Sequence, residues 1–115
     1  MKFKFIKYPH ILCIDDDDKI RKLISKFLIK NNFLVSSSPD ALEAEKLIKF
    51  YSFDLIILDI MMPKIDGIKF LDSFRKKNIR TPVLMLSALG NIEKKIKTYK
   101  IGCDDYLVKP FEPIE

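Results

Sequence analysis

Short apolar runs alternate along the chain with segments of helical periodicity. Ile11–Ile14 is a continuous apolar run of strand length, and the apolar residues of Ile20–Leu28 recur at spacings of three and four, as in an amphipathic helix. The clearest buried strand is Asp54–Asp59, four apolar residues between two acids. The pattern predicts strands at 11–14, 33–37, 54–59, 83–86 and 106–108, and helices near 20–28, 41–48, 68–74 and 91–101.

Capping and breaking residues suggest where these elements begin and end. Ser38 followed by Pro39 predicts the N-cap and first position of the second helix, and Asp66 is expected to cap the third. Asn31-Asn32 is expected to break the first helix, and Gly102 to close the fourth. The connections that remain are short.

Strict alternation of strands and helices predicts an α/β fold with a mainly parallel sheet, covered by helices on both faces as a three-layer sandwich. Crossover connections should be right-handed. Five strands fit the flavodoxin-like order 2-1-3-4-5, an order taken from known folds of this kind. We expect a tail at residues 1–9 and one domain at 10–115.

Composition supports a single globular domain. The chain has 115 residues, with 48% hydrophobic and 32% charged, and no apolar run approaches the ~20 residues that span a bilayer. The start lacks the apolar centre of a signal peptide, so we expect a cytoplasmic protein without a membrane partner. Cys13 and Cys103 have neither metal-ligand nor disulfide-framework spacing and are interpreted as reduced, packed cysteines.

The net charge of +5 raises the question of nucleic-acid binding. However, Lys2, Lys4 and Lys7 crowd the N-terminal tail, and 75–77 is a basic run at the end of a predicted helix, where it favourably meets the helix dipole. We interpret most of this charge as solvated surface.

Polar groups follow the predicted central strands. Asp15–Asp18 follow the first strand, Asp59 ends the third, Ser87 ends the fourth and Lys109 ends the fifth. Carboxyl ends of parallel strands share one sheet edge, and ligands bind there at the switch point between the first and third strands. We therefore expect these groups to gather at one edge.

This set of groups suits phosphoryl transfer. Acids meeting at one edge repel each other, and Mg²⁺, which prefers oxygen ligands and keeps places for water and phosphate, resolves the repulsion. Asp59 can act as a carboxylate nucleophile, while the Lys109 ammonium and the Ser87 hydroxyl stabilise the transferred group. Each group also has an ordinary interpretation: Asp17 and Asp18 can serve only as acids at a helix start, and Ser87 as a surface hydroxyl.

The sequence resembles the CheY-like receiver domains of two-component response regulators. The segments that carry the resemblance are Ile-Leu-Cys-Ile-Asp-Asp-Asp (11–17), Asp-Leu-Ile-Ile-Leu-Asp-Ile-Met-Met-Pro-Lys-Ile-Asp-Gly (54–67), Pro-Val-Leu-Met-Leu-Ser-Ala (82–88) and Gly-Cys-Asp-Asp-Tyr-Leu-Val-Lys-Pro-Phe (102–111). Met-Met-Pro and Asp-Asp-Tyr are closest to the OmpR/PhoB subfamily, whose full-length members carry a DNA-binding domain.

The resemblance implies a role for each matching residue. The implied metal ligands are Asp15, Asp16, Asp59 and the backbone carbonyl of Met61. Asp59 is the implied phosphoacceptor, assisted by Ser87 and Lys109. Ser87 and Tyr106 form the implied switch pair, and the peptide bond before Pro110 is expected to be cis.

The implied function is that of a signalling domain rather than an enzyme. A sensor histidine kinase or phosphotransfer protein would donate the phosphoryl group with Mg²⁺ (or Mn²⁺), and the switched conformer would control an output, most simply transcription, with dimerisation on activation. DNA would be reached only through an output domain not found in this chain. Met61 and Leu89 are apolar and cannot orient a water, so we expect slow autodephosphorylation.

The chain stops where the family's fifth helix should begin, so we expect an exposed apolar patch, lower stability or self-association. A stand-alone or phosphorelay receiver is one alternative. A pseudo-receiver would usually have lost one of the key groups. A phosphohydrolase of the haloacid dehalogenase type would want an acid where Met61 stands.

Overall fold

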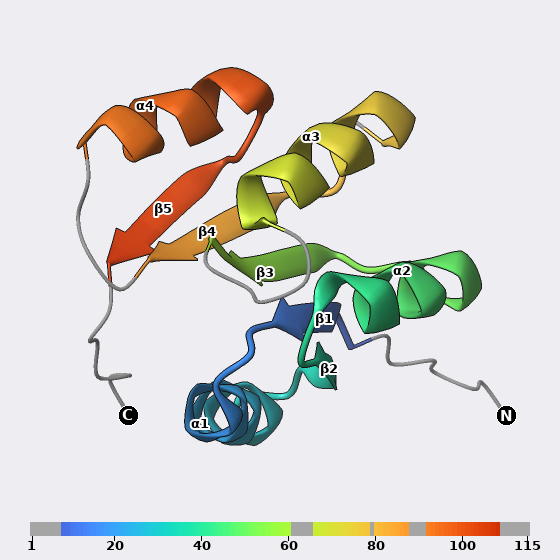
Figure 1. The fold of residues 1–115 in the computed structure, drawn as a ribbon. Coiled ribbons are helices and arrows are strands. Elements are labelled where there is room, and N and C mark those ends of the chain that lie inside the picture. The colour runs from blue at the N-terminus through green and yellow to red at the C-terminus, as the bar shows by residue number, and fades with distance from the viewer. Residues whose placement is uncertain (1–7, 61–65, 79, 88–91, 109–115) are drawn as a thin grey trace, which may run out of the picture.

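The computed structural model describes residues 8–60, 66–78, 80–87 and 92–108 (Figure 1). Strands and helices alternate through these ranges as the sequence predicts. The elements are β1 (His10–Ile14), α1 (Asp18–Lys30), β2 (Leu34–Ser38), α2 (Ala41–Phe50), β3 (Leu55–Asp59), α3 (Gly67–Lys77), β4 (Val83–Ser87), α4 (Ile92–Ile101) and β5 (Asp105–Val108). Within the described ranges, no helix combines the length and apolarity needed to cross a bilayer. The expectation about the family's fifth helix concerns residues 109–115, which lie outside the described residues.

The five strands form one sheet in the order β2-β1-β3-β4-β5, and every neighbouring pair is parallel. The flavodoxin-like prediction is confirmed. The chain leaves β1 toward β2 on one side and returns to β3 on the other. The switch point therefore lies between β1 and β3, as the sequence analysis requires.

The sheet has two differently covered faces (Figure 1). Alternate side chains of a strand point to opposite faces, so Ile56 and Leu58 of β3 pack in the cluster formed with α2 and α3. Ile57, between them, packs in the cluster that contains Ile24 of α1. With both faces covered, the central strands β1, β3 and β4 are nearly continuous apolar runs rather than alternating ones.

Most of the expected helix ends are confirmed. Asp66 accepts a hydrogen bond from the Ile68 backbone N–H at 2.7 Å and caps α3. Asn31 caps the end of α1, and Asn32 takes the left-handed conformation with φ 69°. Gly102 follows α4 with φ 127°, which an L side chain rarely adopts.

The predicted N-cap of the second helix is wrong. Ser38 is the last residue of β2, pairs with Ile14, and accepts a hydrogen bond from the Asp15 backbone N–H. The sheet ladder therefore fixes the backbone of Ser38, and the helix starts later. Asp40 is the actual cap and accepts from the Glu43 N–H at 2.9 Å.

Both cysteines are buried, in agreement with their interpretation as packed residues. Cys13 lies in β1 and packs toward α1, whereas Cys103 packs in the larger cluster on the opposite face.

Candidate functional site

The backbone at the carboxyl ends of β1 and β3 is held by the sheet beyond the strands themselves. Asp15 directly follows β1, and its N–H donates to the Ser38 carbonyl at 3.1 Å. Asp59 ends β3, and the N–H of the next residue, Ile60, donates to the Leu86 carbonyl at 2.9 Å. The two acids therefore project from well-anchored backbone.

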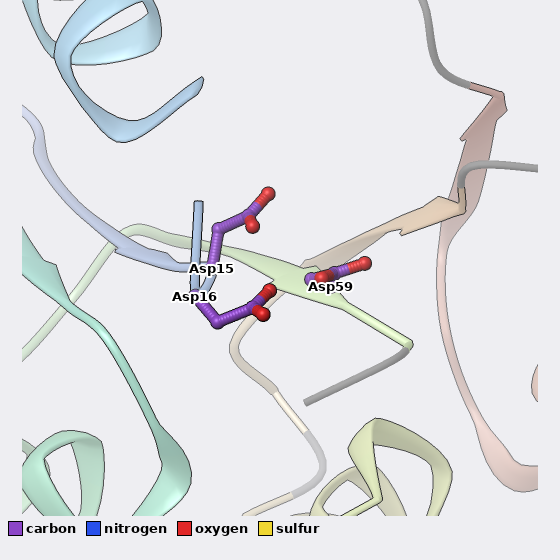
Figure 2. A group of neighbouring side chains, drawn as sticks. All are labelled: Asp15, Asp16 and Asp59. Carbon is purple, nitrogen blue, oxygen red and sulfur yellow. The ribbon is translucent and has the colours of Figure 1, made fainter. Parts of the chain in front are cut away.

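Asp15, Asp16 and Asp59 form a compact acidic pocket. Each offers a carboxylate oxygen, and these oxygens all lie within 4.8 Å of one another. Figure 2 shows Asp15 and Asp16 beyond the end of β1, beside Asp59 on β3. Asp15 is buried and Asp59 is 3% exposed, whereas Asp16 is exposed. The cluster thus has a buried floor and one side open to solvent.

The pocket fits a hard divalent cation. Its donors are all carboxylate oxygens, the type that Mg²⁺ and Mn²⁺ prefer. Like charges at this separation repel, particularly where two of the groups are buried, and a bound cation removes that repulsion. Because Asp16 is exposed, a bound cation would be accessible to water or phosphate oxygens.

The four consecutive aspartates make different contacts. Asp17 is the N-cap of α1, and its carboxylate accepts from the backbone N–H groups of Lys19 and Ile20. Asp18 lies in the first turn and forms an ion pair with Arg21. The interpretation of Asp17 and Asp18 as helix-start acids is confirmed.

Asp15 has a structural contact as well as a place in the pocket. Its Oδ1 accepts a hydrogen bond from the Asp17 N–H at 3.0 Å, which turns the chain at the end of β1. Asp16, between them, is the exposed member of the pocket.

Gly67 packs against the backbone at the end of β3, next to Asp59. It begins α3, and its N–H donates to the Ile60 carbonyl at 2.8 Å. A Cβ at Gly67 would lie 2.2 Å from the Asp59 carbonyl oxygen, a separation that side chains essentially never reach. Only glycine allows α3 to start so close to the acid-bearing strand. Gly67 was not among the residues predicted from the sequence, although its place directly after a capping aspartate was a signal.

The expected switch residues occupy neighbouring strands. Ser87 is the buried last residue of β4 and lies at the same sheet edge as Asp59. Tyr106 of β5 pairs with Met85, and its side chain packs in the cluster shared with α2 and α3. Tyr106 is 8% exposed, and its hydroxyl is buried with no hydrogen-bond partner among the residues that the structure describes. The ring is therefore turned inward here.

Several residues of the expected site lie outside the described residues. They are Met61, Leu89, Lys109 and Pro110. Their expected roles stay predictions.

Comparison with known protein families agrees with this geometry. The family model of the response regulator receiver domain matches residues 11–115. Among curated proteins, the chain is 48% identical over 107 residues to the PetR protein of Rhodobacter capsulatus, covering 93% of this chain and 45% of PetR. It is 36% identical to the transcriptional regulatory protein SrrA of Staphylococcus aureus, covering 91% of this chain and 43% of SrrA. The chain thus spans less than half the length of these relatives.

Solved structures have the same fold. The receiver domain of the Francisella response regulator 1452 has a TM-score of 0.84 at 45% identity, covering 90% of this chain and 86% of that one. Vibrio cholerae chemotaxis protein CheY4 has a TM-score of 0.88 at 33% identity, covering 93% of this chain and 91% of that one. Together with the acidic pocket at the β1/β3 switch point, these matches establish that the chain belongs to the response regulator receiver domain family.

Proposed function

We propose that Asp59 accepts a phosphoryl group from a phosphohistidine on a sensor histidine kinase or phosphotransfer protein. The observation that carries the proposal is the acidic pocket, with three carboxylates converging within 4.8 Å at the switch point of a receiver fold. Asp59 is the strongest candidate for the acceptor because it ends β3 at the centre of the sheet, between the acids after β1 and Ser87 on β4.

In the proposed reaction, a carboxylate oxygen of Asp59 forms a bond to phosphorus while the bond from phosphorus to the histidine nitrogen breaks. The electron pair of the broken bond stays with the imidazole. Asp15, Asp16, Asp59 and the Met61 carbonyl would hold a divalent cation, Mg²⁺ or Mn²⁺. When bound, that cation supplies positive charge for the phosphoryl oxygens.

Two side chains of the chain itself assist in this proposal. The ammonium of Lys109 neutralises charge on the transferred group, and the Ser87 hydroxyl donates a hydrogen bond to it. Met61 and Leu89 offer no group that orients an attacking water. The acyl phosphate on Asp59 is therefore expected to hydrolyse slowly, and the chain acts as a signalling domain that assists its own phosphorylation.

Phosphorylation biases a switch between two conformers in this proposal. Ser87 moves toward the phosphoryl group, and the inward position of Tyr106 becomes favoured. Two of the similar proteins, ycf27 of Cyanidium caldarium and SrrA of Staphylococcus aureus, are named as transcriptional regulators. The output that we propose is therefore control of transcription through a further domain, with dimerisation on activation and DNA contacted by that domain.

The test is incubation with a small phosphodonor such as acetyl phosphate in the presence of Mg²⁺, followed by intact mass measurement. We expect the mass to rise by one phosphoryl group in the wild type and not in Asp59→Asn. A wild-type mass that never changes would indicate a pseudo-receiver, and continuous turnover of a phosphate ester would point to a phosphohydrolase.

A further inference from the structure

Arg21 of α1 contacts the acid-rich loop at more than one point. Its Nη1 donates to the backbone carbonyl of Asp15 at 2.7 Å, and its Nη2 donates to the carboxylate of Asp18. The Arg21 backbone N–H donates to the Asp17 carbonyl as part of α1. One residue therefore joins both ends of the segment that carries Asp16.

The Arg21 side chain is only 17% exposed, whereas its partner Asp18 is 73% exposed. The guanidinium thus lies against the protein, and its Nη1 and Nη2 groups donate to two different acceptors. Its planar fork makes such a double contact with little further loss of rotamer freedom, whereas a lysine ammonium is a point charge on a flexible stem. The contact to the Asp15 carbonyl is the more shielded of the two.

Asp16 depends on this arrangement. The neighbouring acids have structural contacts, because Asp15 accepts from the Asp17 N–H and Asp17 caps the helix. Asp16 is exposed, and the direction of its side chain follows from the backbone between Asp15 and Asp17. The contacts of Arg21 with the Asp15 carbonyl and the Asp18 carboxylate, called the Arg21 clamp below, therefore limit where the Asp16 carboxylate can lie.

We propose that Arg21 is a positioning residue that holds the loop of Asp15–Asp18 in the form that binds a divalent cation. The proposal deepens the proposed function and rests on it, since the cation pocket is the one that would serve Asp59. Arg21 contacts neither the cation nor the phosphoryl group in this role. It reduces the ordering that the loop must undergo when the cation binds.

Charge and geometry make opposite predictions at this position. As a positive charge on the loop of Asp15–Asp18, Arg21 by itself disfavours a further cation, so its removal should tighten Mg²⁺ binding. As a clamp, Arg21 favours binding, so its loss should weaken it. Arg21→Lys keeps the charge and loses the fork, which separates the two effects.

The experiment is the dissociation constant of Mg²⁺ for the unphosphorylated protein, measured by calorimetry at constant ionic strength. Loss of a residue that orients metal ligands typically weakens metal binding by about tenfold or more. We therefore expect about a tenfold higher constant for Arg21→Lys and a higher constant also for Arg21→Gln. Lys22→Gln is the matched control, because it removes one positive charge from the next, exposed position of α1, and it should bind as the wild type does or slightly more tightly.

Melting curves without Mg²⁺ show whether each variant is folded at the titration temperature. A wild-type Mg²⁺ dissociation constant in Arg21→Lys would overturn the proposal. Tighter Mg²⁺ binding by Arg21→Gln would also overturn it, because the charge of Arg21 and not its clamp would then control the affinity. If the wild type itself neither binds Mg²⁺ nor gains a phosphoryl group, the proposed function fails. If the wild type does both and Arg21→Lys binds equally well, only the inference about Arg21 fails.

Discussion

The α-carbon of Gly67 faces the backbone carbonyl of Asp59 so closely that an added Cβ would lie 2.2 Å from the oxygen. The same Cβ would lie 2.8 Å from the Cα of Ile60. Both neighbours are backbone atoms of β3 and its extension, which cannot turn aside as a side chain can. The start of α3 and the end of β3 are thus tightly packed against each other at the acidic pocket.

Gly67→Ala should therefore disturb both stability and the site. The forced contact must be relieved by moving α3 or Asp59, at a cost of about 1–3 kcal/mol or more in the free energy of unfolding. Phosphorylation of Asp59 should slow as well, because its backbone shifts. Urea unfolding and the rate of mass gain with acetyl phosphate measure the two effects. Ser73→Ala, on the exposed side of the same helix, is the control and should change neither.

Asp16→Asn should separate metal binding from stability. Asp16 is exposed but belongs to the acidic pocket, so the substitution removes a proposed metal ligand and also relieves repulsion among the carboxylates. We expect Mg²⁺ affinity to fall by about tenfold or more, as for loss of other groups that support a metal. The melting temperature without Mg²⁺ should stay the same or rise. Asp72→Asn, an exposed acid of α3 near Lys76, controls for the loss of one charge. Unchanged Mg²⁺ affinity in Asp16→Asn would contradict the proposed ligand set.

Tyr106→Phe should not destabilise the inward conformer. The Tyr106 hydroxyl is buried and has no hydrogen-bond partner among residues 8–60, 66–78, 80–87 and 92–108. Removing a buried polar group that lacks a partner is neutral or stabilises by about 1 kcal/mol. Equilibrium unfolding in urea tests this, with Tyr106→Ala as a contrast that should cost about 3–5 kcal/mol through loss of ring packing. A clear loss of stability in Tyr106→Phe would mean that the hydroxyl is bonded after all.

Cys103 should contribute to a fall in stability at alkaline pH. Burial raises the pKa of the Cys103 thiol, and the charges of Asp104 and Asp105 raise it further, although a hydrogen bond with Thr98 and the charge of Arg75 oppose the shift. The folded state thus holds the thiol proton more tightly than the unfolded state does. The contribution of the protonated Cys103 thiol to the free energy of unfolding is fully present below about pH 8.5, the pKa of an exposed thiol. It is lost as the pH rises through the folded-state pKa.

The measurement is the free energy of unfolding from pH 7 to 10, compared between wild type and Cys103→Ala. The absolute stability of the variant is expected to be lower because the substitution removes a buried sulfur. Its decline with pH should nevertheless be shallower. Parallel curves would show that the thiol does not ionise differently in the two states.

The sequence by itself was sufficient for the succession of strands and helices, whereas the strand order was taken from known folds of this kind. The apolar run of Leu55–Leu58 and the periodic stripe of Ile20–Leu28 are local signals. A strand buried on both faces is apolar at every position, and a helix buried on one face is apolar at every third or fourth position. Their alternation allowed few topologies, and the order β2-β1-β3-β4-β5 is among them. Asp59 was identifiable for the same reason: an acid that ends a buried parallel strand must emerge at the binding edge.

Local signals failed where a residue had two possible partners. Ser38 has the chemistry of an N-cap, but its backbone is part of the sheet, where it pairs with β1. Asp40 caps α2 instead. Within Asp15–Asp18, the residue pattern offered four equal carboxylates, and the resemblance to a known family was needed to set Asp15 and Asp16 apart from Asp17 and Asp18.

Only the tertiary structure decided the positions and contacts of these four carboxylates, because they depend on which atoms other segments bring close. The pairing of β1 with β3 places Asp15 and Asp16 next to Asp59, whereas the turn into α1 directs Asp17 to the helix and Asp18 to Arg21. The contact of Gly67 with Asp59 and the inward ring of Tyr106 are likewise set by packing between distant segments. The pattern along the chain specified the strands and helices, and the three-dimensional contacts specified which side chains meet.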